Sequence, residues 1–449
     1  MRKLVLSLAA TPLILGALTV SAQAADVATG AAADSGFNIF SDVKFKGELR
    51  PRYQFSDRKA TTADAGHQVT NRTNLNVSAN LFEAEGLNGT IELNAVNDFG
   101  SEQQANKDVG GEALGAKFSQ ANIDYTVAGV TGIVGRKTVN LDNQRFIGSV
   151  GWKQNFQTFD LAAVAYGTGS FNILAAYVYG VNAIGDMGYD YGRSPEPKYA
   201  GGITSGRTNS ALVNASYKVM DPLKISAYAY LLGSASDTYG LAATGKIAAG
   251  DSMKFNYRAE FAMQQKASLK TFGSPVSANP EHPDSLLGSA MYFNLDVGAN
   301  FSGILAGLNY EVLGGADTTD AKTSQFQTPL ATKHKFNGWA DQFLGTPSTG
   351  LQDLNVRAGY KFATAGKIIG FYHMFSAAAD SATVSTGGVA AGDAYGSEFD
   401  IAYSTKLPGV NNVGLLVKAA MYMDDSTNGV TADDVTLAWV QLDYKFSTK

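Results

Sequence analysis

The stretch that decides the fold is residues 43–55, which read VKFKGELRPRYQF. Its odd positions are mainly apolar or aromatic, whereas every even position carries a charged or amide side chain. Alternation with a period of two puts one class of side chain on each face of a β-strand. An average soluble strand has about five or six residues, and a tilted strand that crosses a bilayer needs about 9–11. The length of this stretch therefore predicts a strand of a transmembrane barrel.

The same alternation recurs along the chain, clearly at 254–265, 291–301 and 440–446. Scanning the sequence with this pattern predicts eighteen strands: 43–55, 70–82, 87–97, 116–127, 130–139, 155–166, 170–180, 209–219, 223–232, 239–247, 254–265, 289–301, 304–313, 352–362, 366–376, 396–406, 412–423 and 434–446. Short and long connections alternate between them, as tight periplasmic turns and long extracellular loops do in outer-membrane barrels. Because hydrocarbon tolerates no open sheet edge, we predict an all-β, closed antiparallel transmembrane barrel of about 18 strands with periplasmic termini.

The N-terminus differs from the rest of the chain. A basic start at Arg2 and Lys3, an apolar run and a small-residue exit at Ala22-Gln23-Ala24 are typical of a secretory signal peptide. A retained membrane anchor is the alternative. We therefore divide the chain as follows: signal peptide 1–24, N-terminal periplasmic segment 25–42, transmembrane β-barrel 43–446 and, within it, the long extracellular loop 314–351. The aromatic and proline residues of this loop make it a candidate lid or constriction, or else a loop packed on its neighbours.

Composition excludes several classes of protein. The 449 residues contain no cysteine, which excludes a disulfide-rich module and a zinc ribbon, and only one long apolar run, which excludes a polytopic helical protein. The four histidines are dispersed without metal-ligand spacing, so we expect no metal, no cofactor and no enzyme. A phospholipase-type barrel is the remaining enzymatic alternative. Acidic loop pairs such as Asp424 and Asp425 could bind Ca²⁺ or be solvated loop tips. The sequence has no basic surface stripe, so it gives no sign of nucleic-acid binding.

The predicted lumen is more basic than the chain as a whole. The net charge of the chain is −5, yet sorting the strand residues by face directs fourteen basic and only nine acidic side chains inward. One sign of charge in a low-dielectric wall raises the local concentration of its counter-ions, so this excess predicts a passage that favours anions. The alternative is that the lumen charges only solvate the wall, with the acidic residues pairing the arginines. These acidic residues are Glu48, Glu92, Asp124, Glu260, Asp296, Glu311, Glu398, Asp400 and Asp443.

Depth along the strands divides the basic residues into two groups. Arginine presents a planar fork that suits carboxylates, whereas lysine acts as a point charge. We predict that the pore-lining and anion-binding side chains are Arg50, Arg52, Arg72, Arg258, Arg357 and Lys418. We predict that a periplasmic vestibule is lined by Lys44, Lys46, Lys218, Lys224, Lys254, Lys361, Lys406 and Lys445.

Two stretches of the sequence resemble a known family. Residues 135–137, GRK, 141–148, LDNQRFIG, and 151–160, GWKQNFQTFD, look like the signature stretch of alginate-export-type outer-membrane porins. Residues 335–347, KFNGWADQFLGTP, followed by GLQD at 350–353, are similar to a second stretch of that family. The resemblance implies an 18-stranded outer-membrane barrel and implies that Arg136 and Arg145 belong to the positively charged pathway. Lys137 and Lys153 depart from the family pattern, which weakens any assignment of an alginate site.

These observations favour a bacterial outer-membrane porin for passive diffusion of small or polymeric anionic solutes, including a carboxylated polysaccharide such as alginate. The expected partners are outer-membrane lipids and lipopolysaccharide, anionic solutes and the barrel-insertion machinery, with a homo-oligomer as an option. The alternative from another class is a structural or adhesive surface protein with a plugged lumen, which the acidic loops suggest.

Overall fold

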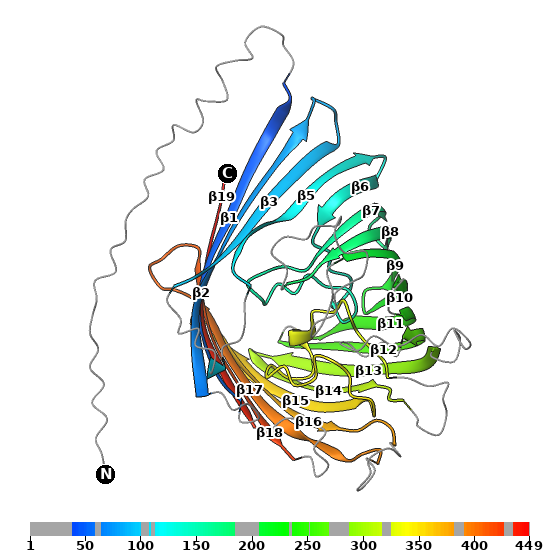
Figure 1. Cartoon of the computed structure of the whole chain (residues 1–449), viewed down its shortest axis with the longest axis vertical. Coiled ribbons are helices and arrows are strands. Elements are labelled where there is room, and N and C mark those ends of the chain that lie inside the picture. The colour runs from blue at the N-terminus through cyan, green and yellow to red at the C-terminus, as the bar shows by residue number, and fades with distance from the viewer. Residues whose placement is uncertain are drawn as a thin grey trace.

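The computed structural model describes residues 38–58, 64–99, 107–108, 113–184, 206–232, 236–250, 252–268, 287–316, 325–380, 390–425 and 434–448. Eighteen long strands form one closed antiparallel barrel (Figure 1). They are β1 (Phe40–Arg58), β2 (Asp64–Leu81), β3 (Leu87–Asp98), β5 (Gly115–Val127), β6 (Val130–Lys137), β7 (Thr158–Gly167), β8 (Phe171–Asn182), β9 (Gly206–Met220), β10 (Leu223–Leu232), β11 (Ser236–Ala249), β12 (Met253–Ser268), β13 (Leu287–Phe301), β14 (Ile304–Leu313), β15 (Leu351–Lys361), β16 (Lys367–Ser376), β17 (Ala394–Lys406), β18 (Val413–Asp424) and β19 (Val435–Ser447).

Two short elements lie outside this ladder. The two-residue strand β4 (Lys107–Asp108) pairs in parallel with the start of β2. The 3₁₀ turn η2 (Lys333–Lys335) lies in the connection between β14 and β15. Within the residues that the structure describes, no helix is long and apolar enough to cross a membrane.

The barrel closes between its first and last strands. β1 pairs with β2 on one side and with β19 on the other, in a register that runs from Lys46 opposite Ser447 to Arg58 opposite Val435. A backbone hydrogen bond of 2.9 Å from Thr448 N to Phe45 O continues this pairing to the end of the chain. Closure leaves no barrel strand without two neighbours, as a wall in hydrocarbon requires.

Side chains alternate between the two faces of the wall. In β1, Leu49 and Tyr53 face outward and are 37% and 40% exposed, whereas Arg52 faces inward and is 2% exposed. The outward face is apolar along the whole barrel, with exposed residues such as Ile91 and Leu295. Polar residues are thus buried inside and apolar residues are exposed outside, which reverses the arrangement of a soluble protein.

Short turns gather at the end of the barrel that holds the start of β1 and the end of β19. Two of them, Ala128-Gly129 and Ser302-Gly303, have positive φ at both residues, 49° and 80° in the first and 47° and 94° in the second. Such two-residue turns match the twist of antiparallel strands, and glycine adopts positive φ without strain.

The predicted fold class and the eighteen predicted strands are confirmed, with shifts at their ends. β1 and β2 are longer than predicted, at 19 and 18 residues, because both extend beyond the clear alternation. β7 begins at Thr158 instead of 155, because residues 155–157 belong to a loop inside the barrel. The predicted signal peptide, 1–24, and residues 25–37 of the predicted periplasmic segment lie outside the described residues.

The assignment of outward and inward side chains can be tested by substitution. Leu295 lies at the middle of β13 and is 45% exposed on that face. Leu295→Arg should lower the free energy of unfolding from lipid vesicles by about 2–4 kcal/mol, the cost of a cation at the bilayer midplane. Asn256→Arg, at an inward position of β12, is the control and should change it by under about 1 kcal/mol. Equal losses in the two variants would contradict the assigned faces.

Candidate functional site

Two connections fold back into the barrel. We call residues 138–157, between β6 and β7, the first inward loop and residues 325–350, between β14 and β15, the second inward loop. Figure 1 shows the yellow η2 turn and its neighbours within the curve of the wall. The two loops are hydrogen-bonded to each other, through Gly148 N to Leu330 O at 2.9 Å and Thr332 N to Gln144 O at 3.0 Å. They therefore form one unit across the lumen.

This unit has buried side chains of its own. Ile147 of the first inward loop is 1% exposed, and Phe326 of the second is 0% exposed. The Phe146 ring packs against the rings of Tyr292, at 5.2 Å, and Phe326, at 5.8 Å. The unit is therefore a packed element fixed on the inner face of β10 to β14. Residues 317–324 of the predicted loop 314–351 lie outside the described residues.

Unusual backbone conformations shape both loops. Asp142, Gln144 and Val150 have φ of 51°, 70° and 53°, and Asn337 and Asp341 have φ of 55° and 59°. Positive φ is uncommon outside glycine and costs most for a β-branched residue such as valine. Strained positions of this kind persist where surrounding contacts determine them, and they concentrate at functional sites.

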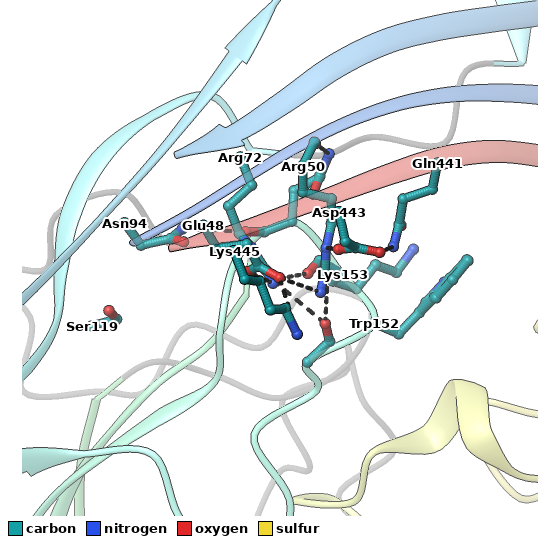
Figure 2. A network of polar contacts seen from close by, with 12 residues as sticks. Glu48, Arg50, Arg72, Asn94, Ser119, Trp152, Lys153, Gln441, Asp443 and Lys445 are labelled. Atoms are coloured by element: carbon teal, nitrogen blue, oxygen red, sulfur yellow. Dashed lines mark hydrogen bonds and ion pairs between the residues drawn. The ribbon is translucent and has the colours of Figure 1, made fainter. Parts of the chain in front are cut away.

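Arg50 and Arg72 fasten the first inward loop to the wall near β1 and β19. Arg50 Nε lies 2.6 Å from Asp443 Oδ1, and its guanidinium also donates to the carbonyl of Gly151 at 2.9 Å. Arg72 forms an ion pair with Glu48 and donates to the carbonyl of Lys153 at 3.2 Å. Figure 2 shows Arg50 and Arg72 with their carboxylate partners Glu48 and Asp443, beside Lys153 of the loop. Both guanidiniums are thus neutralised by carboxylates while they hold the loop.

Arg52 and Arg145 are as deeply buried as Arg72, at 2% exposure each. The Arg52 guanidinium lies 4.2 Å from the centre of the Trp152 ring and donates to Gln441 Oε1. Arg145 is 2% exposed and forms two bonds with Glu311, at 2.8 and 3.0 Å. A bidentate pair of this kind is a strong and directional contact. Arg145 therefore joins the first inward loop to β14 and has little surface left for a solute.

The remaining predicted arginines are also paired. Arg258 binds Asp142 at 2.8 Å and Glu260 at 2.7 Å, and Arg357 binds Asp296 at 2.6 and 2.9 Å. Arg136 pairs with Asp160 at 2.7 Å and donates to the carbonyl of Phe118, whose side chain faces outward. Arg136 is thus held by a carboxylate of the neighbouring strand β7.

Lys418 lies in a cage made by all three tryptophans of the chain. Its ammonium nitrogen is 3.7 Å from the ring centre of Trp339, 4.2 Å from Trp152 and 5.2 Å from Trp439. It also lies 2.7 Å from His334 Nε2. Because Trp152 and Trp339 come from different inward loops and Trp439 from β19, this contact fixes both loops to the wall. A desolvated cation–π contact contributes about 2 kcal/mol or more.

His334 completes this cage. Its ring stacks on Trp152 at 4.6 Å with an angle of 5° between planes, and its Nδ1 lies 2.7 Å from Asp341 Oδ1. Burial lowers the pKa of His334 to about 3, against the opposing effect of Asp341. The ring is therefore neutral, so Nδ1–H donates to Asp341 and Nε2 accepts from Lys418.

The predicted vestibule lysines lie at the end of the barrel that holds the short turns. Of the eight, seven are exposed and Lys224 is half-buried. Lys218 pairs with Asp221 at 2.6 Å and Lys445 lies 3.7 Å from Glu48. Within the described ranges, the other six have no carboxylate at ion-pair distance: Lys44, Lys46, Lys224, Lys254, Lys361 and Lys406.

Sequence reasoning missed two lysines of the same group. Lys246 on β11 and Lys367 on β16 are exposed and occupy inward positions at this end, with Lys367 opposite Lys361 in the register. The alternation alone could have found them, because each has the same parity as the buried residues of its strand, such as Ala242 and His373. The rim is thus more basic than the sequence sorting indicated.

A cavity of about 680 Å³ remains between the inward loops and the wall. Arg258, Arg357 and Lys418 line it, whereas the other predicted site residues lie elsewhere. Lys335 also lines the cavity and is exposed, with its ammonium 2.8 Å from the carbonyl of Asn143. Sequence reasoning missed Lys335 because it lies in a loop, where alternation gives no direction. In the part of the chain that the structure describes, no group of three His, Asp or Glu residues could hold a metal ion.

Comparisons with known proteins agree on the architecture. No protein-family model matches the sequence, and no curated protein matches it either. Among solved structures, Acinetobacter baumannii OccAB2 matches with a TM-score of 0.68 and 12% identity, over 92% of this chain and 99% of that chain. Pseudomonas aeruginosa OccK9 (OpdG) matches with a TM-score of 0.67 and 13% identity, over 92% and 100%. Pseudomonas aeruginosa OccD3 (OpdP) matches with a TM-score of 0.66 and 12% identity, over 92% and 94%.

These matches concern the fold. The chain has the closed 18-strand antiparallel barrel of outer-membrane porin structures. The match does not single out the alginate-export type. The two stretches that carried that resemblance, 135–160 and 335–353, contain most of the two inward loops and the strand ends beside them.

The tryptophan cage can be tested by fluorescence, since all three tryptophans surround Lys418. Lys418→Met should weaken the anchoring of the loops by about 2 kcal/mol, the value of a desolvated cation–π contact. We expect tryptophan emission to move to longer wavelength and acrylamide quenching to increase. Lys445→Met, at the exposed rim, is the control and should leave both unchanged. Identical spectra for the two variants would refute the anchoring role.

The protonation state of His334 gives a pH test. Its pKa is about 3 in the anchored loops and returns to about 6.5 once they are released. The contribution of His334 to anchoring is therefore fully present above pH 6.5 and is lost as the pH falls toward 3. We expect a progressive shift of the tryptophan emission as the pH falls from 6.5 to 4.5. His334→Asn should remove most of that slope, and an unchanged slope would assign it to other groups.

Proposed function

We propose that this protein is a bacterial outer-membrane channel through which small anionic solutes diffuse passively. The observation that carries this proposal is the set of exposed, inward-positioned lysines at the end of the barrel with the short turns. Six of the eight predicted lysines have no carboxylate partner within the described residues, and Lys246 and Lys367 add to them. Several unpaired charges of one sign at the mouth of a low-dielectric wall attract counter-ions into it.

The roles that we propose for the arginines and the lysines differ from those that the sequence favoured. Arg50, Arg72, Arg145, Arg258 and Arg357 pair with carboxylates. An ion pair has little net charge to offer a passing solute, so we assign these arginines mainly to holding the inward loops and the wall. Anion preference then comes from the lysine rim, and the loops set the width of the passage.

The size of the solute follows from the inward loops. They leave a cavity of about 680 Å³ beside the wall, which falls within the range of small-molecule sites, about 300–1,000 Å³. We therefore favour small anions over a polymer such as alginate, which would have to pass this constriction as an extended chain. Transport of this kind needs no cofactor and no catalytic residue. The expected surroundings are outer-membrane lipid and lipopolysaccharide on the apolar outer face.

A second candidate function has its own support. Both inward loops are packed, hydrogen-bonded to each other and fixed by the Lys418 cage, which are the properties expected of a plug. A structural or adhesive surface protein with a plugged lumen would need such an element. Conductance separates the two functions, because a plugged barrel passes no ohmic current.

The test is the reversal potential of the protein in a planar bilayer under a KCl gradient. We expect ohmic channel events with a preference for chloride. Changing Lys44, Lys46, Lys361 and Lys406 together to glutamine should lower the anion-to-cation permeability ratio by about two- to threefold, because the rim field weakens. The same four positions changed to arginine keep their charge and should keep the ratio. Cation preference in the unmodified protein would overturn the proposal, and absence of current would favour the plugged barrel.

A further inference from the structure

The cavity beside the second inward loop contains amide groups that the protein does not use. Asn294 Nδ2 donates to Asn309 Oδ1 at 2.7 Å, which leaves the Asn309 amino group and the Asn294 carbonyl oxygen without a partner among the described residues. Asn143 Oδ1 accepts from the backbone N–H of Arg145 at 3.0 Å, and the Asn143 amino group likewise has no partner among the described residues. Asn355 donates to Asp353 at 3.3 Å and keeps a similarly unpartnered carbonyl oxygen. The cavity thus offers both donors and acceptors.

The charged groups of the cavity are largely engaged with one another. Arg357 makes two bonds with Asp296, and Arg258 is held by Asp142 and Glu260. Lys335 is the exception, because among the described residues its ammonium donates only to the carbonyl of Asn143. A solute that enters therefore meets neutral amides and one lysine, and the two arginines are already paired. An amide presents a donor and an acceptor side by side, which matches a hydroxyl group, itself both donor and acceptor.

One side of the cavity is apolar. Trp339 of the second inward loop and Phe371 of β16 line it, with ring centres 5.4 Å apart and an angle of 63° between the rings. Both residues are half-buried, as is Ile369 beside them on the same inward face of β16. Binding sites for small molecules combine such aromatic surfaces with a few polar groups that fix orientation. The C–H faces of a sugar ring are apolar enough to lie against this surface, while its hydroxyl groups reach the amides.

We propose that this cavity is a binding subsite for a single polyhydroxylated ring, that is, a sugar, whether or not the solute also carries a charge. The proposal deepens the channel function and rests on it, because a solute reaches the cavity only through an open lumen. Unpartnered amides select for hydroxyl groups. A solute analogue that lacks hydroxyl groups would leave the amides of the cavity unpaired. Binding is expected to be weak, because a conducting site must also release its solute.

The experiment measures block of the ion current by D-glucose in planar bilayers. We expect glucose to lower the current reversibly at millimolar concentration, beyond the effect of a polyethylene glycol of equal hydrodynamic radius, which has almost no hydroxyl groups. Asn309→Leu and Phe371→Ala should each raise the half-blocking glucose concentration by about fivefold, the loss of one hydrogen bond or one apolar contact. Asn76→Leu, on the inward face of β2 where Asn76 pairs with Glu92, is the matched control and should leave it unchanged.

Each outcome decides the question. Selective weakening in the two cavity variants, with unchanged current in KCl alone, supports the subsite. Glucose that acts no differently from polyethylene glycol overturns it, and so does an equal effect in all three variants, which would place binding elsewhere. The reversal potential in the same bilayers tests anion preference separately. Glucose block without chloride preference would uphold the subsite and refute the proposed anion selectivity.

Discussion

The structure depends first on the pairing of β1 with β19. An open sheet of eighteen strands would present two rows of unpaired N–H and C=O groups, and hydrocarbon cannot satisfy them. The register from Lys46 opposite Ser447 to Arg58 opposite Val435 removes both edges. Because side chains alternate along each closed strand, the same pairing also separates an apolar outside from a polar inside. The burial of charged residues in the lumen follows from that separation.

A polar lumen of this width needs further organisation, because buried charges are costly unless they are paired. The two inward loops meet this need. Their carbonyl groups accept hydrogen bonds from Arg50 and Arg72, and Asp142 pairs with Arg258. The loops and the wall thus neutralise one another's charges and dipoles. The lumen is narrowed by the same contacts that make its charged residues stable.

The Lys418 cage links these contacts to the last two strands of the chain, β18 and β19. Trp152, Trp339 and Trp439 come from two loops and from β19, so the cage forms only when both loops are seated against β18 and β19. The neutral His334 ring accepts from Lys418, which stabilises the buried ammonium without adding a second charge. Most of the exposed lysines at the end of the barrel with the short turns have no carboxylate partner among the described residues. The basic residues that anchor the loops and the exposed lysines of the rim thus lie at different depths.

The sequence by itself determined the strands, their number and the face on which each wall residue lies. The period of two is a local property, so the inward positions of Arg52, Lys418 and Lys361 could be predicted from their neighbours. Alternation failed in the loops, where Lys335 and His334 have no regular direction. A family resemblance directed attention to Arg136 and Arg145, and the structure pairs them with Asp160 and Glu311.

Only the tertiary structure decided which charges remain available to a solute. Arg50 and its partner Asp443 are 393 residues apart, and Arg145 and Glu311 are 166 apart, so no local pattern could show that these arginines are neutralised. The same holds for the cage, which gathers tryptophans from three distant segments, and for the amides of the cavity. A strand's periodicity fixes where a side chain points. The partner of that side chain is fixed by closure of the barrel and by the path of the loops inside the barrel.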